Sequence, residues 1–187
     1  MQCGGGSEQL QLIRTETIMP RKSIKPNKSI YFLSREEAGL TRAEASEKSL
    51  IPESRIEKIE YGQTMINPQD VVAMAAAYKK PSLCNYFCAN DCEIGRGTVT
   101  ELKVEHLAQI VLSIVNSLNT LNSERDRLIQ IAADGEVNSD ELADFISIRK
   151  KLGEIADTVN SLQLWIDQMM ADGKISREEY EAHLNQK

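Results

Sequence analysis

Two kinds of hydrophobic pattern divide the chain near residue 97. Residues 29–90 carry short apolar stretches separated by Gly, Pro and Asn, which predicts five short helices around one small core. Residues 98–187 instead carry apolar residues at alternating spacings of three and four, the pattern of a coiled-coil seam. The pattern therefore predicts an all-α protein with a five-helix domain at about 29–95 and a helical hairpin at about 98–187.

The two long helices of the predicted hairpin each have an apolar seam. In the first helix the seam is interrupted only by Arg125, and it consists of Leu107, Val111, Ile114, Leu118, Leu121, Leu128 and Ala132. In the second helix it consists of Phe145, Ile148, Leu152, Ile155, Val159, Leu162, Ile166 and Met169. Two helices of about 33 residues, each about 50 Å long, must then fold back as an antiparallel hairpin.

The phrase between the long helices, ADGEVNSDE (133–141), recurs as ADGKISREE (171–179) before a short terminal helix. It resembles the second half of a calcium loop. However, the positions expected to supply the first two carboxylates hold Gln130 and Ala132 in one copy and Gln168 and Met170 in the other, so calcium lacks its ligands. We expect both copies to end one helix at a glycine and to cap the next.

Residues 40–62 predict two short helices joined by a tight turn. Thr41 and Glu44 have the spacing of a capping box, which begins a helix. Pro52 interrupts that helix and is well suited to begin another, which Gly62 then ends. The second helix turns Ile56 and Ile59 inward and leaves an outward face of Glu53, Ser54, Glu57 and Lys58.

This segment resembles the helix-turn-helix of the Cro/repressor-type (xenobiotic-response-element) DNA-binding family over about residues 29–90. The positions in register are Leu40, Thr41, Ile51, Ile56, Ile59, Glu60, Gly62, Asn67 and Pro68. Four positions depart from the family pattern: Arg42 replaces Gln, Ser46 replaces Ala, Leu50 replaces the turn Gly, and Pro52 replaces the capping Ser. A leucine in the left-handed turn conformation costs about 1 kcal/mol or more.

The resemblance implies a sequence-specific transcriptional regulator of bacterial or phage type that binds double-stranded DNA. By position, it implies that Arg42 grips a phosphate and that Glu53, Ser54, Arg55 and Lys58 lie in or beside the major groove. The alternative is a protein-interaction module whose helix-turn-helix no longer binds DNA, because Glu53 and Glu57 oppose the approach of phosphates. Glutamate can also accept a hydrogen bond from cytosine N4, so the acidic face is compatible with base reading.

Charge separates the two parts of the chain. Residues 19–97 carry 12 Lys/Arg and 10 Asp/Glu, whereas residues 98–187 carry 9 and 16, so the C-terminal part is not the nucleic-acid surface. Residues 1–28 read as a flexible tail that becomes basic at Arg21, Lys22, Lys25 and Lys28. This basic stretch either lies along phosphates or is a solvated linker, and the role of residues 1–18 is left open.

Three cysteines, Cys84, Cys88 and Cys92, have a spacing that would place them on one helix face. They could hold zinc or an iron–sulfur cluster with Cys3 or His106 as a fourth ligand. The spacing matches neither a zinc knuckle nor a ferredoxin run, and cysteine is also an ordinary core residue. We therefore expect structural cysteines and no cofactor. The other histidine, His183, is expected to be solvated.

Catalysis and membrane insertion are not indicated. The chain has two histidines, no phosphate-cradling glycine loop and no nucleophile with a convincing base, so we do not expect an enzyme. It has no apolar run long enough for a bilayer and no signal-peptide pattern, so we expect a cytoplasmic protein with reduced thiols.

Apolar residues outside the chosen seams predict a homodimer through residues 98–187. These residues, which still need cover, are Ile110, Val115, Ile129, Ile131, Leu164 and Trp165. Two hairpins could bury them in a four-helix bundle, and symmetric dimers are the commonest oligomers. The alternative is a monomer whose second face meets the DNA-binding domain or a different protein.

Overall fold

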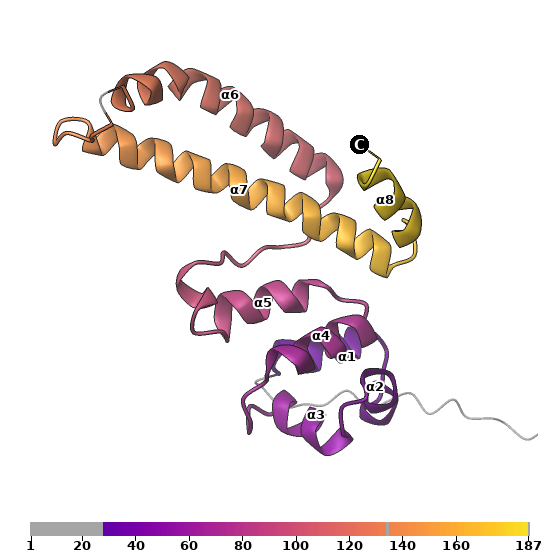
Figure 1. Ribbon diagram of the computed structural model, residues 1–187. Helices are drawn as coiled ribbons and strands as arrows, with labels where there is room; N and C mark the ends of the chain where they lie inside the picture. Colours follow the sequence, from indigo (N-terminus) through magenta and orange to yellow (C-terminus); the bar gives the residue numbers. More distant parts are fainter. Residues whose placement is uncertain (1–27, 134, 187) are drawn as a thin grey trace, which may run out of the picture.

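The computed structural model describes residues 28–133 and 135–186, and all regular secondary structure in this part of the chain is helical, without a strand (Figure 1). The all-α prediction is confirmed. Most of the predicted N-terminal tail, including Cys3, Arg21, Lys22 and Lys25, lies outside the described residues.

The five-helix domain forms as predicted and lies below the hairpin in Figure 1. Its elements are α1 (Ile30–Glu37), α2 (Arg42–Ser49), α3 (Glu53–Glu60), α4 (Pro68–Ala77), α5 (Ser82–Asn90) and a short 3₁₀ helix η1 (Gly95–Gly97). One core joins the five α-helices, and its buried members are Tyr31, Ala45, Ile51, Ile56, Ile59, Val71, Met74, Ala75, Tyr78, Leu83 and Phe87.

The predicted helix boundaries follow from local hydrogen bonds. Thr41 caps α2, because its hydroxyl accepts from the Glu44 backbone N–H at 3.2 Å while the Glu44 carboxylate accepts from the Thr41 N–H at 2.8 Å. Pro52 lies one residue before α3 rather than at its first position. Leu50 has the left-handed conformation expected of the turn, with φ 59°, and 89% of the residue is exposed. The domain thus holds a strained leucine that contributes almost nothing to the core.

Two large apolar residues of the five-helix domain lie outside its core. Leu33 is 39% exposed and Val72 is 60% exposed. Residues 30–33 are four consecutive apolar residues, which leaves the inward direction of α1 undefined by periodicity. The helix in fact buries Tyr31 and Arg35, one turn apart.

The C-terminal part is an antiparallel hairpin of α6 (Leu107–Ile131) and α7 (Leu142–Ala171), followed by α8 (Arg177–Leu184). The first helix has 25 residues rather than about 33, because residues 98–106 are not helical. This segment instead lies against α5, where the Asn85 side chain donates to Thr100 O at 3.0 Å and accepts from the Leu102 N–H at 2.8 Å. An asparagine amide thus satisfies backbone groups that the helix would otherwise have paired.

The predicted seams are shifted on both helices. On α6 the most buried residues are Ile110 and Ile131, whereas Val111 and Leu118 are 46% and 51% exposed. On α7 Ile148 is buried, whereas Phe145, Leu152 and Val159, all predicted to be buried, are 36%, 40% and 54% exposed.

The reason for the shift is that two positions of the true α6 seam are polar. The seam runs through Ile110, Ile114, Ser117, Leu121, Glu124, Leu128 and Ile131, and Ser117 and Glu124 are half-buried. Glu124 forms an ion pair with Lys151 of α7, and Arg127 donates to Asp144 at 2.7 Å. Hydrophobicity alone therefore indicates the neighbouring positions instead.

Both repeated phrases end a helix as predicted. Gly135 and Gly173 have left-handed φ values of 77° and 73° after α6 and α7. Ser176 caps α8 by accepting from the Glu179 N–H at 3.3 Å. The Asn138 N–H donates to the Glu141 carboxylate at 3.3 Å, but α7 begins at Leu142 without a side-chain cap, so the predicted cap of the second long helix is wrong.

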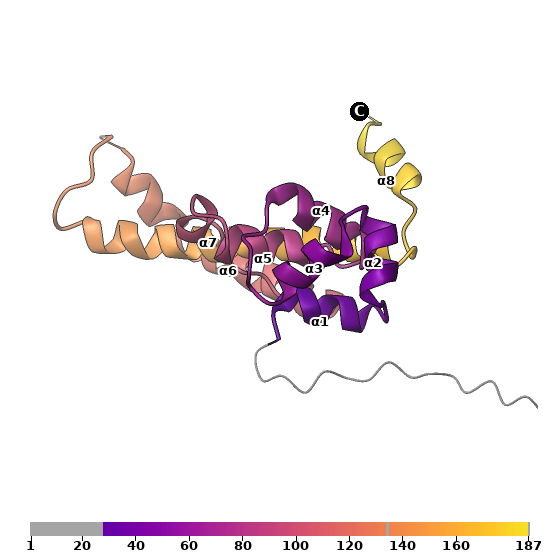
Figure 2. The ribbon, with the colours of Figure 1, turned by 90° about the horizontal axis from the view of Figure 1, so that it is seen from below.

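One face of α7 lies against the five-helix domain. Gln168 donates to the backbone carbonyl of Lys79 at 3.1 Å, and Leu164, one turn earlier on the same face, is 6% exposed. The turn between α6 and α7 projects beyond the domain in both views (Figures 1 and 2). No helix in the described ranges is long and apolar enough to cross a membrane.

Candidate nucleic-acid interface

Helix α3 lies on the side of the domain away from the hairpin (Figure 1). Its buried face carries Ile56 and Ile59, which are 0% and 3% exposed. Glu53, Ser54 and Lys58 are exposed, as the sequence predicted. The helix therefore presents a polar face to solvent while its apolar face is fixed in the core.

A buried ion pair fixes α3 against α1. Arg35 donates to both Glu60 oxygens, from Nε at 2.5 Å and from Nη2 at 3.2 Å, and also to the carbonyl of Leu40 at 2.7 Å. Both side chains are almost fully buried. Because an unpaired buried charge is costly, this pair holds the angle between the two helices.

The predicted phosphate ligand Arg42 is already engaged within the domain. Its guanidinium donates to Glu60 at 2.8 Å and to Glu57 at 3.4 Å, and it lies 5.1 Å from the ring centre of Tyr61. Partial burial by itself would lower the pKa of Arg42, but hydrogen bonds to Tyr61 and Glu60 outweigh it and raise the pKa. About a quarter of the side chain, 23%, is exposed to solvent.

The second predicted cation, Arg55, is also paired. It donates to one oxygen of Asp70 from Nε at 2.9 Å and from Nη2 at 2.5 Å, which links α3 to α4. This hydrogen bond, followed by the attraction of the Asp70 charge, raises the pKa of Arg55. Lys58 is exposed and has no ion-pair partner among the described residues.

The partners of the two arginines were not foreseen from the sequence. The sequence indicates Glu60 only as a position in register with the family pattern, and it assigns no role to Asp70. A signal was present for Glu60, since it follows the inward-facing Ile59 and precedes the helix end at Gly62, so a buried carboxylate that requires a cation could have been inferred.

Cys84, Cys88 and Cys92 do not form a ligand cluster. Cys84 and Cys88 lie on α5 and Cys92 lies beyond its end, and all three are partly buried against the domain core. Burial, followed by the neighbouring Cys88 and Asp167, raises the pKa of Cys84, which keeps its thiol protonated. Among the described residues no group of three His, Cys, Asp or Glu side chains is placed to hold a metal ion. Structural cysteines remain our prediction.

A helix-turn-helix family model matches residues 34–82, from within α1 to the beginning of α5. The match spans the Arg35–Glu60 pair and all five residues expected at the DNA. Searches of curated proteins and of solved structures return no match to this chain. Residues 34–82 are therefore a helix-turn-helix of the Cro/repressor type, a DNA-binding class of domain.

Proposed function

We propose that this protein is a sequence-specific transcriptional regulator of bacterial or phage type that inserts α3 into the major groove of DNA. The observation that carries this proposal is a family-matched helix-turn-helix whose α3 is fixed by a buried ion pair and exposes Glu53, Ser54 and Lys58. Side chains of these types can read base edges. Glutamate accepts a hydrogen bond from cytosine N4, and the serine hydroxyl can donate to or accept from the edges of different bases.

The two arginines have different roles in this proposal. Arg42 exchanges its long contact with the exposed Glu57 for a contact with a DNA phosphate. Its shorter hydrogen bond to the buried Glu60 keeps the guanidinium oriented towards that phosphate. Arg55 stays on Asp70 and positions α3 relative to α4 at the edge of the groove. The domain at 29–95 thus binds DNA, and residues 98–187 bind a partner.

The test is binding to duplex DNA selected from a random pool, measured by fluorescence anisotropy at several salt concentrations. Lys58→Ala should weaken binding and reduce the salt slope by about one ion, because one phosphate contact is lost. Lys150→Ala, an exposed lysine on α7, is the matched control and should change neither quantity. Unchanged affinity and salt slope in both Lys58→Ala and Arg42→Ala would overturn the proposal.

A second candidate function is a protein-interaction module. It is favoured by the charge of residues 41–62, which hold four Lys/Arg and five Asp/Glu, and by the pairing of two of those cations within the domain. The selection experiment separates the two. If no sequence is enriched even at low salt, the interaction module is supported, whereas an enriched site whose cytosine preference is lost in Glu53→Gln supports DNA reading.

We further propose that α6 and α7 mediate a homodimer through one defined face. Each helical residue is rotated about 100° from the one before it, so in an antiparallel pair the positions that follow each seam by one residue turn to the same side. That side carries the exposed Arg125 and Arg149 together with a larger apolar set, which is 36–61% exposed and consists of Val111, Val115, Leu118 and Ile129 of α6 and Phe145, Leu152 and Val159 of α7. We call this set the hairpin face.

The hairpin face has the size and composition of a dimer interface. Its exposed apolar area is on the order of 600 Å² per chain, comparable with the roughly 500 Å² apolar share of a standard 800 Å² half-interface. Residues 107–123 contain no charged residue, although much of this helix is exposed. Interface cores are similarly depleted of charge. Gln168, through which α7 contacts the five-helix domain, is not part of this face, and the exposure of the face residues leaves them accessible to a second copy.

Light scattering coupled to size exclusion tests the dimer. A mass near 20.9 kDa at micromolar concentration would reject it, and a mass near twice that value would support it. Leu118→Asp should convert the dimer to a monomer, because it places a charge at the centre of the hairpin face. Ser113→Asp introduces the same charge on the other side of α6, where the residue is exposed, and should leave the mass unchanged.

A further inference from the structure

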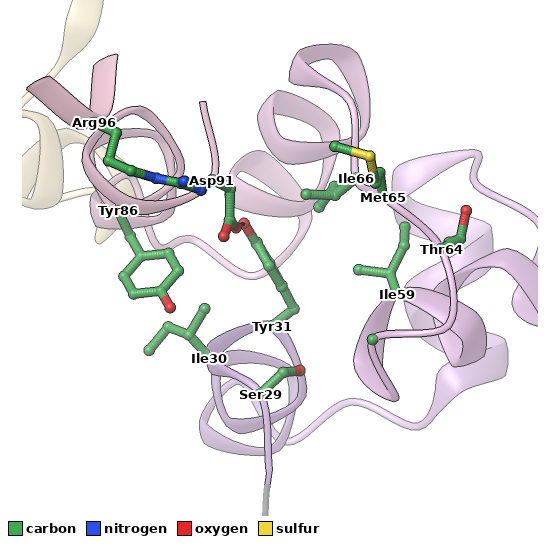
Figure 3. A pocket seen from close by; sticks show the side chains of 11 residues that line it. Ser29, Ile30, Tyr31, Ile59, Thr64, Met65, Ile66, Tyr86, Asp91 and Arg96 are labelled. Carbon is green, nitrogen blue, oxygen red and sulfur yellow. Dashed lines mark hydrogen bonds between the residues drawn. The ribbon is translucent and has the colours of Figure 1, made fainter. Parts of the chain in front are cut away.

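A cavity of about 330 Å³ lies between α1, the loop that follows α3, and the end of α5 (Figure 3). One wall is apolar and is formed by Tyr31, Ile59, Met65 and Ile66. Asp91 and Arg96 lie together at the other end. Apolar walls with a few polar groups at one end are typical of small-molecule sites, and this volume is near the lower limit of about 300 Å³ for such sites.

The carboxylate of Asp91 is held in place by a buried tyrosine. The Tyr31 hydroxyl donates to Asp91 Oδ2 at 2.5 Å, and Tyr31 is 6% exposed. Burial, followed by this hydrogen bond, raises the pKa of Tyr31 well above its ordinary value, so the phenol remains a donor at physiological pH. No hydrogen bond within the described residues uses the second carboxylate oxygen, Asp91 Oδ1.

The guanidinium of Arg96 is also held in place. Its Nε and Nη2 donate to the carbonyl of Asn90 at 3.1 and 3.0 Å, which leaves Nη1 available. The backbone that carries it passes so close to α5 that a Cβ at Gly95 would collide with the carbonyl of Cys88. A glycine is therefore required to bring Arg96 to the cavity.

These two opposite charges form no ion pair with each other within 4.0 Å, although both line the same end of the cavity. A ligand with an ammonium and a carboxylate attached to the same carbon atom would pair with both. From this arrangement we propose that the cavity binds a free α-amino acid with an apolar side chain, its ammonium on Asp91, its carboxylate on Arg96 and its side chain against Ile59 and Ile66.

The ligand would also affect DNA binding, an effect that rests on the proposed function. Ile59 belongs to α3, and Met65 and Ile66 belong to the loop that leaves it. A bound ligand restrains this loop against α1. It thereby restricts how far α3 can shift when it enters the major groove.

Direct binding to the full chain without DNA is the primary test, so its outcome does not depend on DNA recognition. Leucine and phenylalanine are titrated by calorimetry, beside 4-methylpentanoate and isoamylamine, which lack the ammonium and the carboxylate of leucine respectively. We expect one amino acid per chain, with each analogue at least about tenfold weaker because one charge-assisted hydrogen bond is lost. Absence of binding by any apolar amino acid at millimolar concentration would overturn the inference.

Variants assign the two ends of the ligand. Asp91→Asn can still accept from Tyr31, so the fold is kept while the ammonium loses its partner, and Arg96→Gln removes the partner of the carboxylate. Each variant should weaken the affinity for leucine at least about tenfold. Arg149→Gln, which replaces an exposed arginine on α7, should leave that affinity unchanged. Leucine binding that is equal in Arg96→Gln and in the unaltered chain would reject the site. If leucine binds as expected but DNA is never bound, the proposed function fails and the site stands.

Discussion

The five-helix domain and the hairpin differ in how completely each buries its own apolar residues. Among the described residues, twelve of the sixteen buried hydrophobic residues lie between Tyr31 and Phe87, and four lie in the hairpin. The hairpin is the longer part, and many of its large apolar side chains are more than one third exposed. The domain thus covers most of its own apolar residues, whereas the hairpin leaves apolar residues exposed, as the proposed dimer requires.

The largest effect should come from the buried ion pair of the domain. Glu60→Ala leaves Arg35 buried without a counter-charge, and we expect a loss of about 3–5 kcal/mol in the free energy of unfolding. Urea unfolding followed by the near-ultraviolet circular dichroism of the tyrosines measures it. The control is Glu37→Ala, which breaks the exposed pair with Lys80 and should cost less than about 1 kcal/mol. Equal losses in the two variants would contradict the role given to Glu60.

A second prediction compares one core residue from each region. Ile56→Ala and Ile148→Ala each remove a side chain that is 0–1% exposed, and each should cost about 2–4 kcal/mol. If the proposed dimer forms, the midpoint of hairpin unfolding should rise with protein concentration in the unaltered chain and in Ile148→Ala alike, because association stabilises the folded hairpin by mass action, whereas the midpoint of the five-helix domain should not. Trp165, the single tryptophan, lies on α7, so its fluorescence reports hairpin unfolding. A hairpin transition independent of concentration would argue against the dimer.

A third prediction concerns the left-handed backbone positions of the two regions. Leu50→Gly should stabilise the domain by about 1 kcal/mol, because it relieves the strain at φ 59° and removes a side chain that is 89% exposed. Gly135→Ala, at φ 77° after α6, should destabilise the hairpin by a similar amount. Thermal unfolding of both variants tests the pair, and the expectation fails if both changes have the same sign.

The smallest effect is a pH dependence at the beginning of α2. Backbone and side-chain hydrogen bonds from Thr41 lower the pKa of Glu44 below its ordinary 4.5. A carboxylate with a lowered pKa contributes stability that is present at neutral pH and is lost as the pH falls below 4.5 towards the folded-state value. Carbon-detected NMR titration of Glu44 should show the lowered pKa in the unaltered chain and an ordinary one in Thr41→Ala.

The accuracy of the sequence predictions also differs between the two regions. Boundaries set by neighbours within four residues, such as the Thr41–Glu44 capping box and the ends at Gly62 and Gly173, were predicted correctly. The α6 seam was misplaced because Ser117 and Glu124 are polar, and the beginning of α6 was misplaced because Asn85 holds residues 100–102.

The candidate site was predicted in outline only. The outward face of α3 follows from helical periodicity, which requires only the positions of Ile56 and Ile59. The sequence does not reveal that Arg42 and Arg55 form ion pairs within the domain. Their partners, Glu60 and Asp70, are 18 and 15 residues away and become neighbours only through packing.

The hydrogen bonds of Asn85 to residues 100 and 102 leave little free chain between the domain and the hairpin. In the proposed dimer the two copies of α3 would then behave as parts of one rigid body rather than as independently tethered modules. Such a body tolerates little change in operator geometry. One extra base pair between the half-sites rotates one half-site by about 35° relative to the other. A rigid dimer could follow that rotation only by releasing residues 100–102 from Asn85 or by twisting the DNA.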